Sequence, residues 1–477
     1  MPVLPHPPLV IDLDGTLLRS DLLLETGLEF LRDQPQRCLQ PLAWLARGKA
    51  ELKQQFAQAT ELDVAVLPYD QSVLNLILTE RARGRRVVLA TASHRRLADR
   101  VAAHLGVFDE VLATEDGRNL SAETKRDVLV QAFGERGFDY VGNSRDDLPV
   151  WRAALRGYVA NAAPALQQEA GRVTEVAGVL GEGLPQWRDW WQALRLHQWL
   201  KNLLLFVPLL AAHRYGDAPL LADALLAFLC FGMCASSVYI LNDLLDLRDD
   251  GRHLRKRRRP FASGRLPVHS GLLVFPVMLL AAFGLALWQL PPAFVGTLAI
   301  YYGLTLAYSL LLKRLMVIDV MTLAALYTLR IIAGAMALAI SLSFWLLAFS
   351  MFMFLSLAMV KRFAELYPAR AEGNVERTLG RGYFPADLEM IASLGASAGY
   401  MAVMVLALYI NDGDTTLLYR HQEIIWLACP LLLTWITRVW MLAHRGEMHD
   451  DPVIFAMRDR FSLVIGALLA LVFWAAT

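Results

Sequence analysis

A series of long apolar stretches from about residue 200 onward constrains this chain more than any other feature. A helix needs roughly 20 apolar residues to cross the hydrocarbon core of a bilayer, and several stretches reach that length. Of the 477 residues 56% are hydrophobic, and the mean hydropathy is +0.38, which is high for a soluble protein. We therefore expect an all-α polytopic membrane bundle of nine transmembrane helices. The nine expected spans are 200–213, 219–241, 271–290, 292–312, 316–340, 342–360, 389–410, 423–443 and 461–476.

Charge is informative locally rather than globally. The formal net charge is +1, which gives no general positive field for nucleic acid. The loops after the second, fourth, sixth and eighth expected spans hold most of the loop lysines and arginines, whereas the other loops hold essentially Arg214 and Arg420. The positive-inside rule places the first set in the cytoplasm. The N-terminus lacks the basic start and long apolar run of a signal peptide, so we expect an integral inner (cytoplasmic) membrane protein whose N-terminal domain is cytoplasmic.

The first 180 residues follow a different pattern, in which short apolar runs alternate with helical segments. This alternation predicts an α/β domain with a parallel sheet covered on both faces. The expected strands lie at 9–15, 86–93, 109–114, 139–144 and 157–162.

Residues 181–200 join the two halves and are rich in tryptophan. Trp187, Trp190, Trp191 and Trp199 suit the headgroup layer of an amphipathic interfacial linker, or they dock the two domains together. The membrane domain would then occupy residues 201–477. The four cysteines form no CxxC pair, and we expect neither disulfides nor zinc.

The acidic segment, Leu241 to Pro260, reads LNDLLDLRDDGRHLRKRRRP and follows the second expected span. Asp243, Asp246 and Asp250 are spaced to lie on one helical face, with Asp249 pointing away. Clustered carboxylates of this kind suit Mg²⁺, which shares its coordination shell with substrate phosphates. The basic residues that follow can hold further phosphate charge, although the same features also describe a solvated helix end with a positive-inside anchor. Asp319 and Arg330 share a face inside a later span, where ionisable groups usually line a cavity.

Several motifs after residue 190 resemble the UbiA superfamily of membrane transferases, and in particular its decaprenyl-phosphate phosphoribosyltransferase branch. The segments that carry the resemblance are LRLHQWLKN (194–202), SSVYILNDLLDLRDDGRHLRKRRRPFASG (236–264), AYSLLLK (307–313), YTLRIIAGA (327–335), MVKRFAEL (359–366) and MRDR (457–460).

The resemblance implies transfer of 5-phosphoribose from phosphoribosyl pyrophosphate to a polyprenyl (decaprenyl-type) phosphate, with release of pyrophosphate. Asp243, Asp246 and Asp250 would hold Mg²⁺ on the diphosphate. The alternative is a prenyltransferase with a prenyl diphosphate donor and an aromatic acceptor, which usually carries a second aspartate-rich motif where this chain has only Asp319. The implied substrate-binding residues are Arg195, Lys201, Asn242, Lys256, Arg257, Arg259, Lys313, Arg330, Lys361, Arg362 and Arg458.

The N-terminal half resembles the haloacid-dehalogenase-like (HAD) phosphatases through DLDGTL (12–17), Thr91, Lys125 and GNSRDDLP (142–149). The resemblance implies a Rossmann-like domain with a small helical cap at about 20–80. An aspartate after a strand can attack phosphorus while a second aspartate two residues later handles the proton. By resemblance Asp12 is the nucleophile and Asp14 the acid/base, while Thr91 and Lys125 bind phosphate.

A second Mg²⁺ is implied at this site, held by Asp12, Asp14, Asn143 and Asp147. Asn143 stands where the family usually has aspartate, so weaker metal binding, or a phosphatase-like fold without turnover, is the alternative. Both halves together suggest sequential chemistry in which the soluble half removes the 5-phosphate of the membrane half's product. The non-catalytic alternative is a membrane scaffold with two inactive domains.

Overall fold

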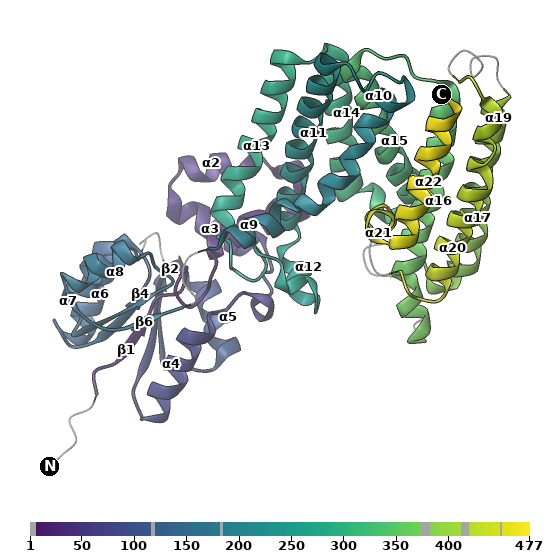
Figure 1. The fold of residues 1–477 in the computed structure, drawn as a ribbon. Helices are drawn as coiled ribbons and strands as arrows, with labels where there is room; N and C mark the ends of the chain where they lie inside the picture. Colours follow the sequence, from purple (N-terminus) through teal and green to yellow (C-terminus); the bar gives the residue numbers. More distant parts are fainter. Residues whose placement is uncertain (1–5, 116–119, 182–184, 374–381, 412–418, 449–450) are drawn as a thin grey trace. The chain divides into compact units, whose positions relative to one another are not determined.

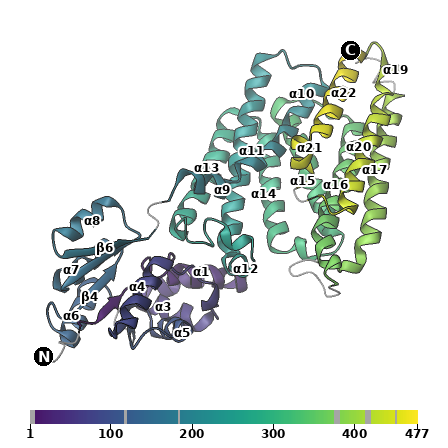
Figure 2. The ribbon, with the colours of Figure 1, turned by 60° about the horizontal axis from the view of Figure 1, so that its bottom comes forward.

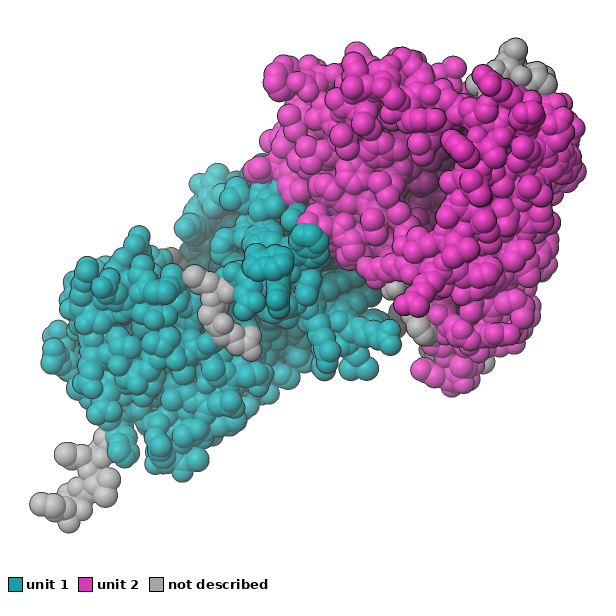
Figure 3. Space-filling model, viewed as in Figure 1, with its two compact units in different colours: residues 1–194, 239–276 teal, residues 195–238, 277–477 magenta. Residues whose placement is uncertain are grey.

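The computed structural model describes residues 6–115, 120–181, 185–373, 382–411, 419–448 and 451–477. The chain forms two compact units, coloured separately in Figure 3. Unit 1 combines residues 1–194 with 239–276, and unit 2 combines residues 195–238 with 277–477. The loop that carries the acidic segment therefore packs with the N-terminal residues, whereas the sequence suggested contiguous domains.

Unit 1 is built on a six-stranded parallel sheet of order β3-β2-β1-β4-β5-β6. All five predicted strands are confirmed. Apolar alternation did not reveal the edge strand β6, because only every second residue of it is partly buried. The strands are β1 (Leu9–Ile11), β2 (Val87–His94), β3 (Glu110–Thr114), β4 (Asp139–Gly142), β5 (Arg156–Ala160) and β6 (Glu175–Leu180).

Helices cover both faces of the sheet, as a parallel sheet requires. Leu9 and Ile11 of β1 pack towards α4 (Gln71–Ala82) and α5 (Arg95–Leu105). Val10 points to the opposite face, which is covered by α6 (Ala122–Phe133), α7 (Leu148–Ala153) and α8 (Pro164–Gly171). Figures 1 and 2 show these two helical layers on either side of the strands.

The cap consists of α1 (Leu22–Asp33), α2 (Gln40–Ala46), α3 (Lys49–Ala59) and a short turn at Val64–Val66. Phe30, Trp44 and Phe56 form its small aromatic core, with ring centroids 5.1–5.6 Å apart. The cap is shorter than the predicted 20–80 range, because Val73 and Ile77 of α4 pack against the sheet instead.

Seven helices among the described residues are long and apolar enough to cross a membrane, or eight if the bent pair α21 (Pro452–Arg458) and α22 (Arg460–Ala476) forms one span. The other membrane helices are α11 (Ala218–Leu245), α13 (Val268–Gln289), α14 (Pro292–Leu310), α15 (Ile318–Leu338), α16 (Phe344–Ala371), α17 (Leu388–Ile410) and α20 (Ala428–His444), the last preceded by α19 (Gln422–Ile425).

The first predicted span, residues 200–213, is not confirmed. These residues fall in a 3₁₀ segment, Leu196–Phe206, followed by the five-residue helix α10 (Val207–Ala211). This stretch contains the buried polar residues Lys201 and Asn202 and is too short to cross a bilayer as one helix. The buried apolar core of unit 2 lies instead among α15, α16, α17 and α20, where Tyr327 stacks on Phe354 at 5.1 Å.

Candidate active sites

The phosphatase-like residues meet at the carboxyl edge of the sheet in unit 1. Asp12 directly follows β1, Thr91 lies in β2, and Asn143 directly follows β4. The carboxyl ends of parallel strands form the usual ligand-binding edge of such sheets. Of the residues predicted from separate motifs, Asp12, Asp14, Lys125, Asn143 and Asp147 line one cavity, and Thr91 lies buried beside it.

Asp12 is held from both sides. Its two carboxylate oxygens accept hydrogen bonds from Lys125 Nζ at 2.7 Å and Thr16 Oγ1 at 3.1 Å. Burial raises the pKa of Asp12 to about 7, while the Lys125 ammonium opposes the rise. The same ammonium donates to Tyr140 Oη at 3.0 Å, and Tyr140 donates to Asp147 Oδ1 at 2.6 Å. A continuous polar chain thus fixes the predicted nucleophile.

Asp14 faces the cap and the end of β2. It accepts the Leu22 backbone N–H at 2.9 Å, the Ser93 hydroxyl at 2.6 Å and the Thr91 hydroxyl at 3.3 Å. Burial is the main reason that the pKa of Asp14 is raised to about 6, a value suited to proton transfer near neutral pH. Sequence reasoning missed Ser93, although a hydroxyl two residues beyond Thr91 on the same strand points to the same face.

Asn143, one of the predicted metal ligands, lies against Gly15. Gly15 has φ +75°, and a Cβ there would lie 2.0 Å from the Asn143 side-chain nitrogen, so only glycine lets Asn143 approach. Asp147 Oδ2 accepts the Asn143 and Ser144 backbone N–H groups, each at 3.0 Å. No three His, Cys, Asp or Glu side chains in the described part of the chain have metal-holding geometry. However, the carboxylates of Asp12, Asp14 and Asp147 outnumber the Lys125 ammonium, so the charge and oxygen donors fit Mg²⁺.

These residues open into a cavity of about 770 Å³ within unit 1. Lys49 and Lys53 of α3 line it from the cap, and Lys53 donates to the Ala92 carbonyl at 2.6 Å. The volume lies in the range of about 300–1,000 Å³ that small-molecule sites occupy.

Asp243 and Asp250 of the acidic segment share one guanidinium. Both carboxylates are only 2% exposed, and Arg259 Nη1 donates to Asp243 at 3.1 Å and to Asp250 at 2.7 Å. Burial raises the pKa of Asp250 to about 6, with Arg259 opposing the rise. Two buried carboxylates beside a single cation retain negative charge, so this donor set also fits Mg²⁺.

The helix that should carry the three aspartates is interrupted. α11 ends at Leu245, Asp246 has φ −99°, and α12 (Leu247–Arg252) begins immediately afterwards. Backbone hydrogen bonds from Asp246 to Asn242 and from Asp250 to Asp246 keep the helical spacing across the break. Asp249 points away, as predicted, and pairs with Arg32 at 2.6 Å.

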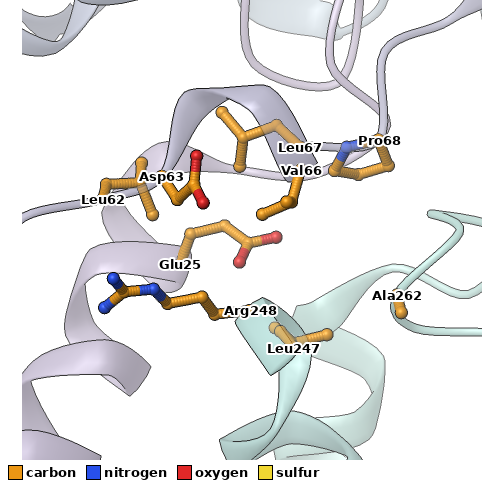
Figure 4. Close-up of a pocket in the computed structure, with 9 residues that line it drawn as sticks. All are labelled: Glu25, Leu62, Asp63, Val66, Leu67, Pro68, Leu247, Arg248 and Ala262. Atoms are coloured by element: carbon orange, nitrogen blue, oxygen red, sulfur yellow. The ribbon is translucent and has the colours of Figure 1, made fainter. Parts of the chain in front are cut away.

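Basic residues of this segment divide between two roles. Arg248 pairs with Glu29 of the cap at 2.6 Å, and Arg252 pairs with Asp63 at 2.6 Å. Figure 4 shows Glu25 lying among Asp63, Leu247 and Arg248, where the cap meets α12. Lys256 and Arg257 are exposed. Sequence reasoning missed the cap contacts, since nothing local pairs residues more than 180 positions apart.

A second polar cluster lies within unit 2 and centres on Asp451. Its carboxylate accepts hydrogen bonds from Lys201 at 2.7 Å, Lys361 at 3.1 Å and Tyr327 at 2.9 Å. Both lysines were predicted, whereas Asp451 was missed. Its signal was an aspartate directly before proline, since Asp451 caps α21 by accepting the Val453 N–H at 3.2 Å.

Arg330 and Asp319 do not pair with each other. Arg330 donates to Asn202 at 3.1 Å and to Tyr301 at 3.1 Å, and forms no ion pair with a described carboxylate. Asp319 is fully buried and pairs with Arg362 at 2.8 Å. Arg362 is itself 0% exposed and also pairs with Glu365. The prediction that Arg362 contacts substrate phosphate stays a prediction, and in this structure the guanidinium is engaged by Asp319 and Glu365.

The remaining predicted residues occupy helix ends. Arg195 adopts a left-handed conformation with φ +50° before the 3₁₀ segment. Arg458 is exposed at the end of α21, and Lys313 is half-buried in a short 3₁₀ turn after α14. Asn242 lies next to Asp243 near the end of α11.

Comparison with known families agrees with both halves. Residues 203–462 match the sequence model of the UbiA prenyltransferase family. The chain belongs to the UbiA prenyltransferase family. Residues 9–152 match the haloacid dehalogenase-like hydrolase model, so a HAD-like domain precedes the UbiA domain.

The similar proteins differ in how much of this chain they match. The chain is 37% identical to the uncharacterized protein y4nM of Sinorhizobium fredii, over 98% of this chain and 90% of that protein. It is 39% identical to nodulation protein NoeC of Azorhizobium caulinodans, over 59% of this chain and 92% of NoeC. It is 31% identical to decaprenyl-phosphate phosphoribosyltransferase of Mycobacterium tuberculosis, over 60% of this chain and 91% of that enzyme.

Proposed function

We propose that the UbiA domain transfers 5-phosphoribose from phosphoribosyl pyrophosphate to a polyprenyl phosphate and releases pyrophosphate. The observation that carries the proposal is the pair of buried carboxylates, Asp243 and Asp250, which share the single cation Arg259 at the end of a membrane helix. Similarity to the mycobacterial phosphoribosyltransferase supports the choice of donor.

In the proposed reaction the bond from ribose C1 to pyrophosphate breaks, and pyrophosphate leaves with the electron pair. A bond then forms from C1 to an oxygen of the lipid phosphate. Asp243, Asp246 and Asp250 would hold Mg²⁺, which would neutralise the departing diphosphate. The lipid phosphate is already anionic, so the protein needs to orient it more than to deprotonate it. The proposed phosphate contacts are Arg195, Lys201, Asn242, Lys256, Arg257, Arg259, Lys313, Arg330, Lys361, Arg362 and Arg458.

The HAD-like domain would then remove the 5-phosphate of the lipid product. Asp12 attacks phosphorus as the bond to the ribose oxygen breaks, and Asp14 donates a proton to that oxygen. Asp14 then takes a proton from water as water attacks the aspartyl phosphate and releases inorganic phosphate. Asp12, Asp14, Asn143 and Asp147 would hold the second Mg²⁺, and Thr91 and Lys125 would contact the phosphate. Both reactions would occur on the cytoplasmic side of the inner membrane.

A donor assay tests the transferase. Full-length protein in nanodiscs receives ribose-labelled phosphoribosyl pyrophosphate, polyprenyl phosphate and Mg²⁺, and label should enter the lipid fraction. Asp243→Asn should lower the rate about 100-fold or more, since a buried charge contact to the donor is lost. The matched control is Asp249→Asn, because Asp249 lies on the same segment but is exposed and pairs with Arg32. Label passing from a prenyl diphosphate to an aromatic acceptor instead would establish the alternative prenyltransferase function.

A second assay tests the phosphatase. Asp12→Asn should accumulate the phosphorylated lipid and abolish phosphate release while transfer continues. Identical lipid products from this variant and the unaltered protein would refute the phosphatase step and leave the transferase proposal standing.

A further inference from the structure

The phosphatase cavity has a wall that catalysis alone does not require. Besides the sheet edge and the cap, it is lined by Pro185, Gln186, Asp189, Arg265, Val268 and His269. We call these six residues the membrane-side wall. All belong to unit 1, so they form one compact body with Asp12 and Lys49.

Two features place this wall next to lipid. Val268 and His269 are the first residues of α13, a 22-residue candidate span of which only 17% is buried within the protein. Gln186 and Asp189 lie at the start of α9 (Trp187–Leu194), whose Trp187 and Trp191 are 70% and 53% exposed. Exposed tryptophans beside the end of an apolar helix are typical of the headgroup layer. Trp190, in contrast, packs on Phe261, with the ring centroids 6.4 Å apart, and this contact fixes α9 to the loop before α13.

Hydrogen bonds hold the wall in place. Arg265 donates to Asp189 at 2.6 Å, to Gln192 at 3.0 Å and to the Arg258 carbonyl at 2.6 Å. The Asp189 charge is therefore neutralised. In the described part of the chain, no side-chain hydrogen bond or ion pair engages the exposed Lys49 or His269. Two donors that line the cavity, one on the cap and one on the membrane-side wall, thus stay available for an anionic group.

We infer that Lys49 and His269 bind the phosphodiester of a lipid-linked sugar phosphate while Asp12 acts on its terminal phosphate. This inference rests on the proposed phosphatase activity and names its substrate class, a phosphate monoester on a sugar anchored in the bilayer. The cavity of about 770 Å³ has room for a sugar bearing two phosphates. The membrane-side wall lets the lipid chain of the substrate remain in the bilayer. A soluble sugar phosphate has no phosphodiester and would lack the contacts to Lys49 and His269.

The test compares two substrates on the full-length protein in nanodiscs. One is synthetic farnesyl-phosphoryl-ribose 5-phosphate and the other is soluble ribose 5-phosphate. The unaltered protein should show a kcat/KM at least tenfold higher for the lipid-linked substrate. The double substitution Lys49→Ala with His269→Ala should lower that ratio by about tenfold or more, the effect of losing charge-assisted hydrogen bonds. The single substitution Lys49→Arg, with His269 unaltered, should keep most of the unaltered protein's ratio of the two kcat/KM values, because the charge is retained.

Internal controls keep the test decisive. Both rates come from one sample, so misfolded protein cancels from the ratio. The matched control is Arg96→Ala, which removes an exposed cation on α5 outside the cavity and should leave the ratio unaltered. An unaltered protein without preference, or a double variant with an unchanged ratio, overturns the inference. If the Asp12→Asn variant still releases phosphate from both substrates, the phosphatase proposal itself is refuted.

Discussion

Asn143 is the residue at which the proposed phosphatase site departs from the aspartate expected from the resemblance to HAD phosphatases. The amide lies against Gly15, where a Cβ would come within 2.0 Å of it. An amide oxygen is a neutral ligand, whereas aspartate adds a charge of the sign that Mg²⁺ requires. If Asn143 binds Mg²⁺ as proposed, the chain keeps an oxygen ligand at this position and gives up part of the electrostatic attraction.

Asn143→Asp should tighten Mg²⁺ binding at the phosphatase site. We expect the Mg²⁺ concentration for half-maximal phosphate release to fall about tenfold, because one more carboxylate faces the cation. A Mg²⁺ titration of ribose 5-phosphate hydrolysis measures the change. The control is Asn161→Asp, which also lines the cavity but was not assigned a metal role, and an equal shift there would show that only general charge matters.

Glu25 makes the stability of the cap region depend on pH. Burial raises the pKa of Glu25 to about 7, with Asp21 and Glu29 adding to the rise and the Ser20 hydroxyl, 2.6 Å away, opposing it. A folded-state pKa above the ordinary value of 4.5 means that folding favours neutral Glu25. This contribution is complete below about pH 4.5 and disappears as pH rises through about 7.

Glu25→Gln should therefore stabilise the folded protein at pH 8 by up to about 3 kcal/mol and change little at pH 5. Denaturant unfolding of the full-length protein at both pH values measures the difference. The control is Glu61→Gln, since Glu61 is exposed. A gain of the same size at pH 5 would contradict the ionisation argument.

At the level of elements, the pattern of apolar residues predicted most strands and membrane helices, because these elements depend on local sequence. The five strands from β1 to β5 and most membrane helices follow from runs of apolar residues. The first expected span was not confirmed because this apolar run contains two buried polar residues, Lys201 and Asn202. Their partners, Asp451 and Arg330, lie 250 and 128 positions away in the sequence, so local sequence does not reveal them. The residues of the HAD-like site were predicted from short motifs at or after the expected strands, whereas the ion pairs of the acidic segment with the cap have no local signature.

Those ion pairs should differ in strength according to burial. The Arg248–Glu29 pair has side chains 33% and 5% exposed, while the Arg252–Asp63 pair is 50% and 25% exposed. A double-mutant cycle with alanine should give a coupling free energy of about 1–2 kcal/mol for the first pair and about 0–1 kcal/mol for the second. Unfolding of the single and double variants measures both values. Equal coupling free energies for the two pairs would mean that burial does not set the strength of these ion pairs.

At the level of the whole molecule, one chain carries a UbiA domain and a HAD-like domain. The cap contacts the acidic segment, which bears the aspartates proposed for the transferase. The proposed product of the first domain is a lipid, which diffuses in two dimensions once it is released. A covalent tether keeps the second domain at a high effective concentration near each newly formed product. Fusion should therefore shorten the lifetime of the phosphorylated intermediate without altering either reaction.

Low-density proteoliposomes allow that effect to be measured. One preparation contains the unaltered chain, and the other contains Asp12→Asn and Asp243→Asn chains, each at the density of the unaltered chain. The number of active sites of each kind is then equal, and only their presence in the same chain differs. The phosphorylated lipid should peak at a severalfold lower level in the first preparation, because its product meets a phosphatase before it diffuses away. The difference should shrink as protein density rises, since the mean distance to any phosphatase then approaches the length of the tether. Equal peaks at every density would show that the two domains act independently despite their covalent linkage.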